Sequence, residues 1–140
     1  MITIERIRNV EIFQGLNDDE LRIVSQFCRE ETVPQGTPLC VEGARADKLF
    51  ILEEGTVAIK FKKGGQFEIS GPGKILGWSF LVPPNRYTAS ADTVTASRLL
   101  TVKSPDFYEM VHTDSKMGLK IMDNLAQIVS RRLKAFVEIY

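Results

Sequence analysis

Residues that bind metals or form disulfides are scarce in this sequence. It has two cysteines and one histidine in 140 residues, whereas disulfide frameworks and iron–sulfur clusters need more cysteines than this. Cys28 and Cys40 fall within apolar patterns, so we expect both to be small buried residues. His112 is expected on a helix or at the surface. We therefore expect no metal site.

Excess charge of either sign and long apolar runs are absent as well. Lys plus Arg and Asp plus Glu number 18 each, so no overall positive field attracts nucleic acid or an anionic membrane. No apolar run reaches the roughly 18 residues of a membrane-spanning helix. The first residues lack the basic, apolar and small-residue regions of a signal peptide. These absences predict a cytoplasmic protein that binds no membrane.

What is present indicates one domain of the α+β class. The composition, 44% hydrophobic and 26% charged, is ordinary for a globular protein, and the chain is long enough for a single domain over residues 1–140. Residues 1–30 predict helices, with Asn17 as an N-cap and Glu20 completing a capping box. In residues 31–103, short apolar runs alternate with Gly and Pro turns, which is typical of a β-barrel or jelly roll. Residues 104–140 predict helices again.

Residues 77–88 carry the clearest indication of binding chemistry. Gly77 precedes a short potential helical turn, and Arg86 stands just before a β-like run. Backbone N–H groups at a helix start, facing a guanidinium, form an anion site suited to a phosphate.

Four further motifs give this region a context. They are Gly36–Gly43, Asp47–Leu52, Gly55–Val57 and Gly73–Gly77. In that order they resemble the β-rolls of cyclic nucleotide-binding domains, those of the Crp/Fnr regulators and of kinase regulatory subunits. The resemblance covers about residues 10–135. It implies N-terminal helices, a double-stranded β-helix (jelly roll) with a phosphate-binding cassette at 76–88, and a long C-terminal helix.

The resemblance also implies a ligand, cAMP or cGMP, and seven candidate ligand-binding residues: Gly77, Trp78, Ser79, Phe80, Arg86, Tyr87 and Thr88. In the family, backbone amides and the arginine hold the phosphate, and an acidic side chain binds the ribose 2′-hydroxyl. Trp78 occupies the position of that acid, and indole offers one donor and no acceptor. A poorly matched hydroxyl costs about 1–3 kcal/mol. Two outcomes stay open: Trp78 or Tyr87 stacks on a base, or Trp78 fills the cavity and Arg86 pairs with an internal carboxylate.

A metal-dependent enzyme on a similar β-roll is the catalytic alternative. Such enzymes hold their metal with clustered histidines and carboxylates, and this chain has one histidine. The serines of the roll, such as Ser70 and Ser90, have no second histidine to share and no Gly-x-Ser-x-Gly elbow. We therefore expect that the chain is not an enzyme.

The segment 116–140 predicts a long helix that is apolar over more than one face. One stripe comprises Leu119, Met122, Ala126, Val129, Leu133 and Phe136, and beside it lie Ile121, Leu125 and Ile128. A helix of this width can pack on its own domain and still contact a partner. Because the matching helix of Crp-like proteins forms the dimer seam, the resemblance implies a homodimer through Met122, Leu125, Val129, Leu133 and Phe136. The simpler alternative is a helix that only caps the roll. The basic cluster Arg131, Arg132 and Lys134 is expected on a solvated face.

The sequence stops before the tens of residues that a helix-turn-helix module would occupy, so we expect no direct DNA binding and a stand-alone sensory domain. Two functions stay open. The first is a sensor that binds a nucleotide or another anion at Arg86 and couples it to the dimerising helix, in signal transduction or transcription regulation. The second is a ligand-free interaction module with a plugged pocket, which binds a partner protein.

Overall fold

The computed structural model describes the backbone of residues 2–139 and the side chains of residues 2–135. Helices lie at both ends of the chain and strands between them, as the sequence predicted. The N-terminal elements are α1 (Ile4–Ile7), the 3-10 helix η1 (Glu11–Phe13) and α2 (Asp18–Ser25), and the C-terminal ones are α3 (Ser104–Thr113) and α4 (Ser115–Ile139). A second 3-10 helix, η2 (Trp78–Leu81), interrupts the series of strands.

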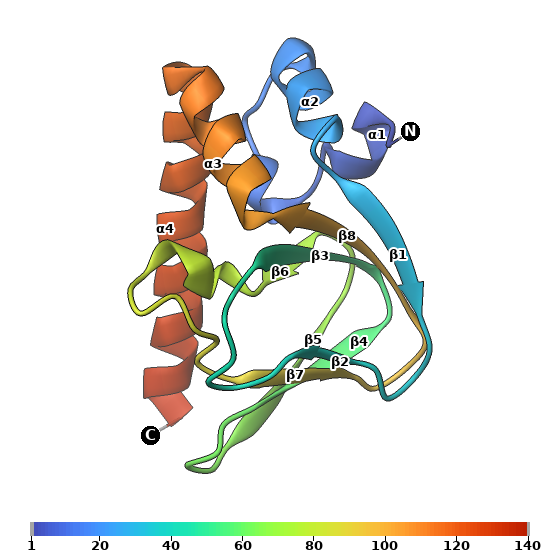
Figure 1. Ribbon diagram of the computed structural model, residues 1–140, viewed down its shortest axis with the longest axis vertical. Coiled ribbons are helices and arrows are strands. Elements are labelled where there is room, and N and C mark those ends of the chain that lie inside the picture. Colours follow the sequence, from blue (N-terminus) through green and yellow to red (C-terminus); the bar gives the residue numbers. More distant parts are fainter. Residues whose placement is uncertain (1, 140) are drawn as a thin grey trace.

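Eight strands form two four-stranded antiparallel sheets, with the orders β1-β8-β3-β6 and β2-β7-β4-β5. The strands are β1 (Arg29–Val33), β2 (Pro38–Cys40), β3 (Lys48–Glu54), β4 (Thr56–Lys60), β5 (Gln66–Ser70), β6 (Lys74–Leu76), β7 (Ser90–Thr93) and β8 (Ser97–Lys103). The two sheets face each other and enclose the interior of the roll (Figure 1). This arrangement confirms the predicted jelly roll.

Strand β3 is the centre of the core and positions the cassette. Its residues Leu49, Phe50, Ile51 and Leu52 are all at most 1% exposed. One face of the strand lies toward the roll interior and the other toward the helices above it (Figure 1), so successive apolar residues are buried on both faces. Phe50 pairs with Leu76 of β6, which sets where β6 ends and η2 begins.

The N-terminal helices are joined to α4 by specific polar contacts. The predicted capping box of α2 is present: the Asn17 side chain accepts from the Glu20 N–H at 2.9 Å, and the Glu20 carboxylate accepts from the Asn17 N–H at 2.9 Å. The same Glu20 oxygen also accepts from Lys120 of α4 at 2.8 Å. Two ends of the chain that lie a hundred residues apart are therefore held together at a buried carboxylate.

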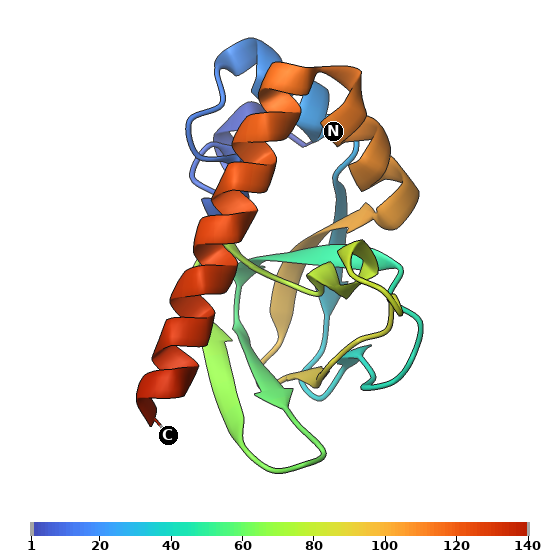
Figure 2. The same cartoon turned by 90° about the vertical axis from the view of Figure 1, so that its left-hand side faces the viewer.

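Helix α4 runs along the whole molecule, from the N-terminal helices to the hairpin of β4 and β5 (Figure 2). Its residues Ile121, Leu125 and Ile128 are buried in the core. Leu119 and Leu133 are 64% and 61% exposed. The helix thus buries one apolar face against its own domain and leaves a second one in solvent.

Both cysteines are free and buried, as predicted. Burial raises the pKa of the Cys28 and Cys40 thiols to about 12, so both are neutral at physiological pH. His112 is exposed on α3. Within the part of the chain that the structure describes, no helix is both long and apolar enough to cross a membrane.

Candidate functional site

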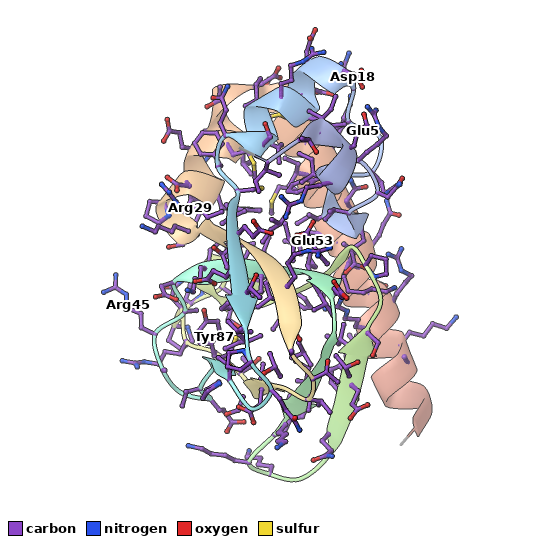
Figure 3. All side chains as sticks on the ribbon, turned by 90° about the vertical axis from the view of Figure 1, so that its right-hand side faces the viewer. Glu5, Asp18, Arg29, Arg45, Glu53 and Tyr87 are labelled. Carbon is purple, nitrogen blue, oxygen red and sulfur yellow. The ribbon has the colours of Figure 1, made fainter. Side chains whose placement is uncertain are left out.

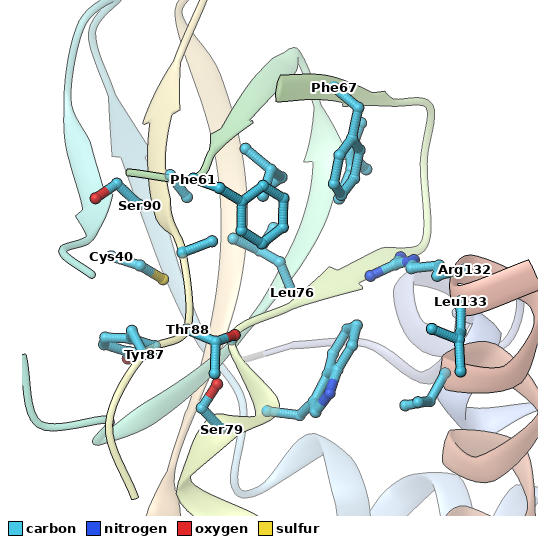
Figure 4. A pocket seen from close by; sticks show the side chains of 17 residues that line it. Cys40, Phe61, Phe67, Leu76, Ser79, Tyr87, Thr88, Ser90, Arg132 and Leu133 are labelled. Carbon is cyan, nitrogen blue, oxygen red and sulfur yellow. The ribbon is translucent and has the colours of Figure 1, made fainter. Parts of the chain in front are cut away.

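A cavity of about 360 Å³ lies between the roll, the cassette and α4 (Figure 4). Most of its lining is apolar, and four lining side chains carry a hydroxyl group: Ser79, Tyr87, Thr88 and Ser90. Its lining residues are Cys40, Ile59, Phe61, Phe67, Ile69, Leu76, Gly77, Trp78, Ser79, Tyr87, Thr88, Ala89, Ser90, Ala91, Val129, Arg132 and Leu133. A mostly apolar hollow with a few polar groups is the usual form of a small-molecule site.

The cassette enters this cavity through Gly77, the N-cap of η2. Gly77 has a φ of 86°, in the left-handed region. A Cβ there would lie 3.1 Å from the Lys48 carbonyl oxygen and 3.2 Å from the Phe50 ring, so both the backbone conformation and the close approach require glycine. The turn that follows brings Trp78 and Ser79 to the cavity wall.

Phe80 has a different place from its neighbours in the cassette. It is 3% exposed, lies edge-on to Phe107 of α3 at 5.4 Å between ring centroids, and is not among the lining residues. Its carbonyl oxygen accepts from the Tyr108 hydroxyl at 3.1 Å. Phe80 therefore anchors η2 to α3.

Arg86 points away from the cavity. Its side chain is exposed, and its Nη1 donates to the Gly43 carbonyl oxygen at 2.9 Å. Arg86 is not among the lining residues. Among the described residues it makes no ion pair with a carboxylate, so the internal acid that the second alternative pairs with it is not found.

Tyr87 and Thr88 line the cavity on the side of β7. Tyr87 lies inside the roll and is 6% exposed, whereas Arg45 extends outward (Figure 3). The Tyr87 hydroxyl donates toward an Asp47 carboxylate oxygen and the Lys48 carbonyl oxygen, both at 3.2 Å. Burial raises the pKa of Tyr87. The ring is therefore a fixed neutral wall whose hydroxyl already has partners.

Arg132 is the site residue that the sequence did not indicate. It was expected on a solvated face with Arg131 and Lys134, but its side chain is only 23% exposed and it lines the cavity. Its guanidinium lies 5.0 Å from the centre of the Trp78 ring, a cation–π contact. Its Nη2 donates to Glu11 Oε2 at 2.8 Å. Figure 4 shows the guanidinium extending from α4 into the cavity.

Glu11 in η1 binds two partners through that same oxygen. It accepts from Arg132 of α4 and from the Ile75 N–H of β6, the latter at 2.7 Å. Burial lowers the pKa of Arg132, and the Glu11 charge opposes that decrease. The cavity's cation is thus held between an indole ring and a carboxylate.

The seven predicted site residues divide in two. Gly77, Trp78, Ser79, Tyr87 and Thr88 line the cavity, whereas Phe80 and Arg86 do not. A ligand-binding role for any of the seven stays a prediction. Within the described residues, no three His, Cys, Asp or Glu side chains gather where they could hold a metal ion.

Comparison with known proteins agrees with the fold. The sequence model of the cyclic nucleotide-binding domain matches residues 30–114. A cyclic nucleotide-binding protein from Geobacter metallireducens has a solved structure that is 30% identical, with a TM-score of 0.82, over 95% of this chain and 99% of that one.

Two curated proteins are similar over most of this chain. The cyclic AMP receptor protein of Thermus thermophilus is 27% identical over 127 residues, which are 88% of this chain and 57% of that protein. Glutaminase 2 of Bradyrhizobium diazoefficiens is 32% identical over 121 residues, 86% of this chain and 19% of that protein. The chain therefore spans about a fifth to somewhat over half of these relatives. On the family match and on the likeness to the Geobacter structure, the chain belongs to the cyclic nucleotide-binding domain family.

Proposed function

We propose that this chain is a sensory domain in which a small effector, a nucleotide or another anion, binds in the cavity and alters how α4 meets a second copy. One observation carries the proposal: α4 lines the cavity with Val129, Arg132 and Leu133 and also presents an exposed apolar stripe. An occupant of the cavity would therefore touch the element that faces a partner.

The exposed stripe has the spacing of a coiled-coil seam. Leu119, Met122, Ala126, Val129 and Leu133 follow one another at intervals of three and four residues, which keeps apolar positions on one side of a helix. Leu119, Met122 and Leu133 are 64%, 37% and 61% exposed, whereas Leu125 is 6% exposed. We therefore leave Leu125 out of the predicted seam. The side chain of Phe136 lies outside the described residues.

The cavity wall supports binding in place of catalysis. Its hydroxyl groups belong to Ser79, Tyr87, Thr88 and Ser90, and no described lining residue is a histidine or a carboxylate that would act as a general base. Its thiol, Cys40, is neutral because burial raises its pKa to about 12. A regulatory role needs none of these groups to react.

Fluorescence of Trp78 tests the proposal directly, because it is the one tryptophan in the sequence and it lines the cavity. A panel of cyclic mononucleotides, cyclic dinucleotides and organic anions is titrated into the full chain, and each hit is verified by calorimetry. A saturable change for at least one compound is the expected result. If no compound of the panel binds in either measurement, the proposed sensor function is wrong.

The second candidate is a ligand-free interaction module, and two contacts favour it. Arg86 is engaged with Gly43 outside the cavity, and Arg132 already covers Trp78. This candidate predicts that the dimer forms through α4 equally well with every compound in the panel. A ligand-dependent change in dimer affinity distinguishes the sensor from it.

A further inference from the structure

The cavity has one cationic side chain among its lining residues, and it comes from α4. That residue is Arg132, and no described aspartate or glutamate shares the wall with it. The cassette arginine, Arg86, is exposed and donates to Gly43. The positive charge that an occupant would meet therefore comes from α4 and not from the cassette arginine that the sequence indicated.

Arg132 has donor capacity left for an anion. A guanidinium carries five N–H groups, and within the described residues Arg132 uses one of its nitrogens, Nη2, in a hydrogen bond to Glu11. Its side chain is 23% exposed and lies against the Trp78 ring, where water screens its charge poorly. An acidic group of a ligand that accepts from the remaining N–H groups would form a charge-assisted hydrogen bond.

The rest of the wall suits an apolar body. Phe61 and Phe67 form a tilted pair at 6.2 Å between ring centroids, and both line the cavity, as does Trp78. Besides Arg132, the wall offers the hydroxyls of Ser79, Thr88 and Ser90 and that of Tyr87, which already has partners. No described lining residue is a carboxylate that could accept from a ribose hydroxyl. A sugar would leave several hydroxyl groups poorly matched there.

From these three observations we infer that the cavity selects an amphipathic organic anion, with one acidic group bound by Arg132 and an aromatic or aliphatic body against Phe61, Phe67 and Trp78. The inference rests on the proposed sensor function and names its ligand class. It makes Arg132 the specificity-determining residue and Glu11 its intramolecular competitor, because Glu11 already holds the guanidinium at 2.8 Å.

The test compares two ligands of nearly the same size and shape, one charged and one neutral. Calorimetry on the full chain measures the affinity of 4-phenylbutyrate, an aromatic carboxylate, and of 4-phenylbutyramide, its neutral amide. We expect the carboxylate to bind about tenfold more tightly or better, as a charge-assisted hydrogen bond provides. Arg132→Gln should abolish the preference, and Arg86→Gln should leave it unchanged. Equal affinities in the unaltered chain, or a preference that depends on Arg86 alone, would overturn the inference.

Glu11→Gln supplies a control with the opposite sign. Glutamine keeps an acceptor for the Ile75 N–H but removes the charge that competes for Arg132. We expect carboxylate affinity to rise severalfold with amide affinity unchanged. If the Glu11–Arg132 pair merely supported the fold, both variants would lose affinity together, and that result would reject the inference.

Parallel titrations with cAMP and cGMP separate this inference from the sensor function itself. Binding of either nucleotide in an Arg86-dependent manner, with no response to 4-phenylbutyrate, keeps the sensor and rejects the ligand class. Failure of all four compounds to bind rejects the ligand class and favours the interaction module.

Discussion

Asn124 of α4 donates from its side-chain Nδ2 to two backbone carbonyl oxygens of the N-terminal segment, Ile12 at 3.0 Å and Gln14 at 2.8 Å. These two bonds use both hydrogens of one amide. They lie between the Lys120–Glu20 and Arg132–Glu11 ion pairs along the same helix. Helix α4 is therefore held to the N-terminal segment at three successive polar points.

Replacing Asn124 with alanine should lower the free energy of unfolding by about 1–3 kcal/mol, because two backbone carbonyl groups lose their donor. Urea denaturation measures the change. Gln127→Ala is the matched control, since Gln127 is exposed on the same helix, and it should change stability by less than about 0.5 kcal/mol. Because alanine favours a helix more than asparagine or glutamine does, helix propensity would not lower stability in either variant. Equal losses in both variants would therefore show that the two Asn124 hydrogen bonds contribute nothing specific.

Gly77→Ala should destabilise the domain more than Gly36→Ala. Both glycines have left-handed φ angles, 86° and 83°, so both variants incur a backbone cost of about 1–2 kcal/mol. Only at Gly77 would the added methyl group meet neighbours, the Lys48 carbonyl oxygen at 3.1 Å and the Phe50 ring. The difference between the two variants in urea denaturation isolates this close approach. Equal losses in the free energy of unfolding would show that β3 and η2 move apart enough to accommodate the methyl group at little cost.

Much of the fold could be predicted because turns and strand pairing leave strong local signals. Gly77 and Gly36 stand at left-handed turns, where glycine is strongly favoured. The Asn17–Glu20 capping box formed where its spacing placed it. The order of such motifs along the chain sufficed to indicate the roll, since each one depends on residues that are close in sequence.

The two errors at α4 have a common cause, which is that helix faces depend on what packs against them. Arg132 lies eleven residues after Ile121 and seven after Leu125, so it shares the inward face with them. Arg132 also belongs to the basic cluster with Arg131 and Lys134, and because such clusters are usually solvated, the sequence favoured an exposed position for it. Leu125 was predicted at the dimer seam because it is apolar. It lies four residues after Ile121, on the same face of α4, and is buried in the core.

The direction of Arg86 could not be predicted from its position in the cassette. Its partner, the Gly43 carbonyl oxygen, belongs to a loop more than forty residues earlier. That contact depends on how the loop after β2 closes against the segment before β7. The cassette motif predicts which residue stands at position 86. It does not predict that the Gly43 carbonyl oxygen, brought close by the tertiary structure, accepts a hydrogen bond from its side chain.

The predicted dimer can be tested with charge on the exposed stripe. Leu119→Glu combined with Met122→Glu should give a folded monomer, because a carboxylate is costly at a desolvated seam. Neither residue lines the cavity, so ligand binding should persist. Sedimentation at tens of micromolar measures the association. Gln127→Glu, exposed on the same helix but off the stripe, should leave it unchanged. A monomeric wild-type chain under these conditions would contradict the prediction.

Trp78 should decide which ligand class the cavity accepts. Trp78→Glu removes the ring beneath Arg132 and places an acceptor where the family has its acid, so a ribose 2′-hydroxyl gains a partner worth about 1–3 kcal/mol. Exposed Arg86 is free to turn toward a phosphate once its bond to Gly43 is given up. We expect cAMP or cGMP affinity to rise at least about tenfold and 4-phenylbutyrate affinity to fall.

Two companion variants identify the cause of that change. Trp78→Leu opens similar room without adding an acceptor. If nucleotide affinity rises in this variant too, the added space and not the carboxylate is responsible. Arg86→Ala added to Trp78→Glu should remove the gain, because the phosphate then loses its charged donor. Since the substitutions remove the tryptophan signal, calorimetry measures the affinities, and thermal melting verifies that each variant is folded. A folded Trp78→Glu chain that binds neither nucleotide would show that the cavity excludes nucleotides through residues other than Trp78.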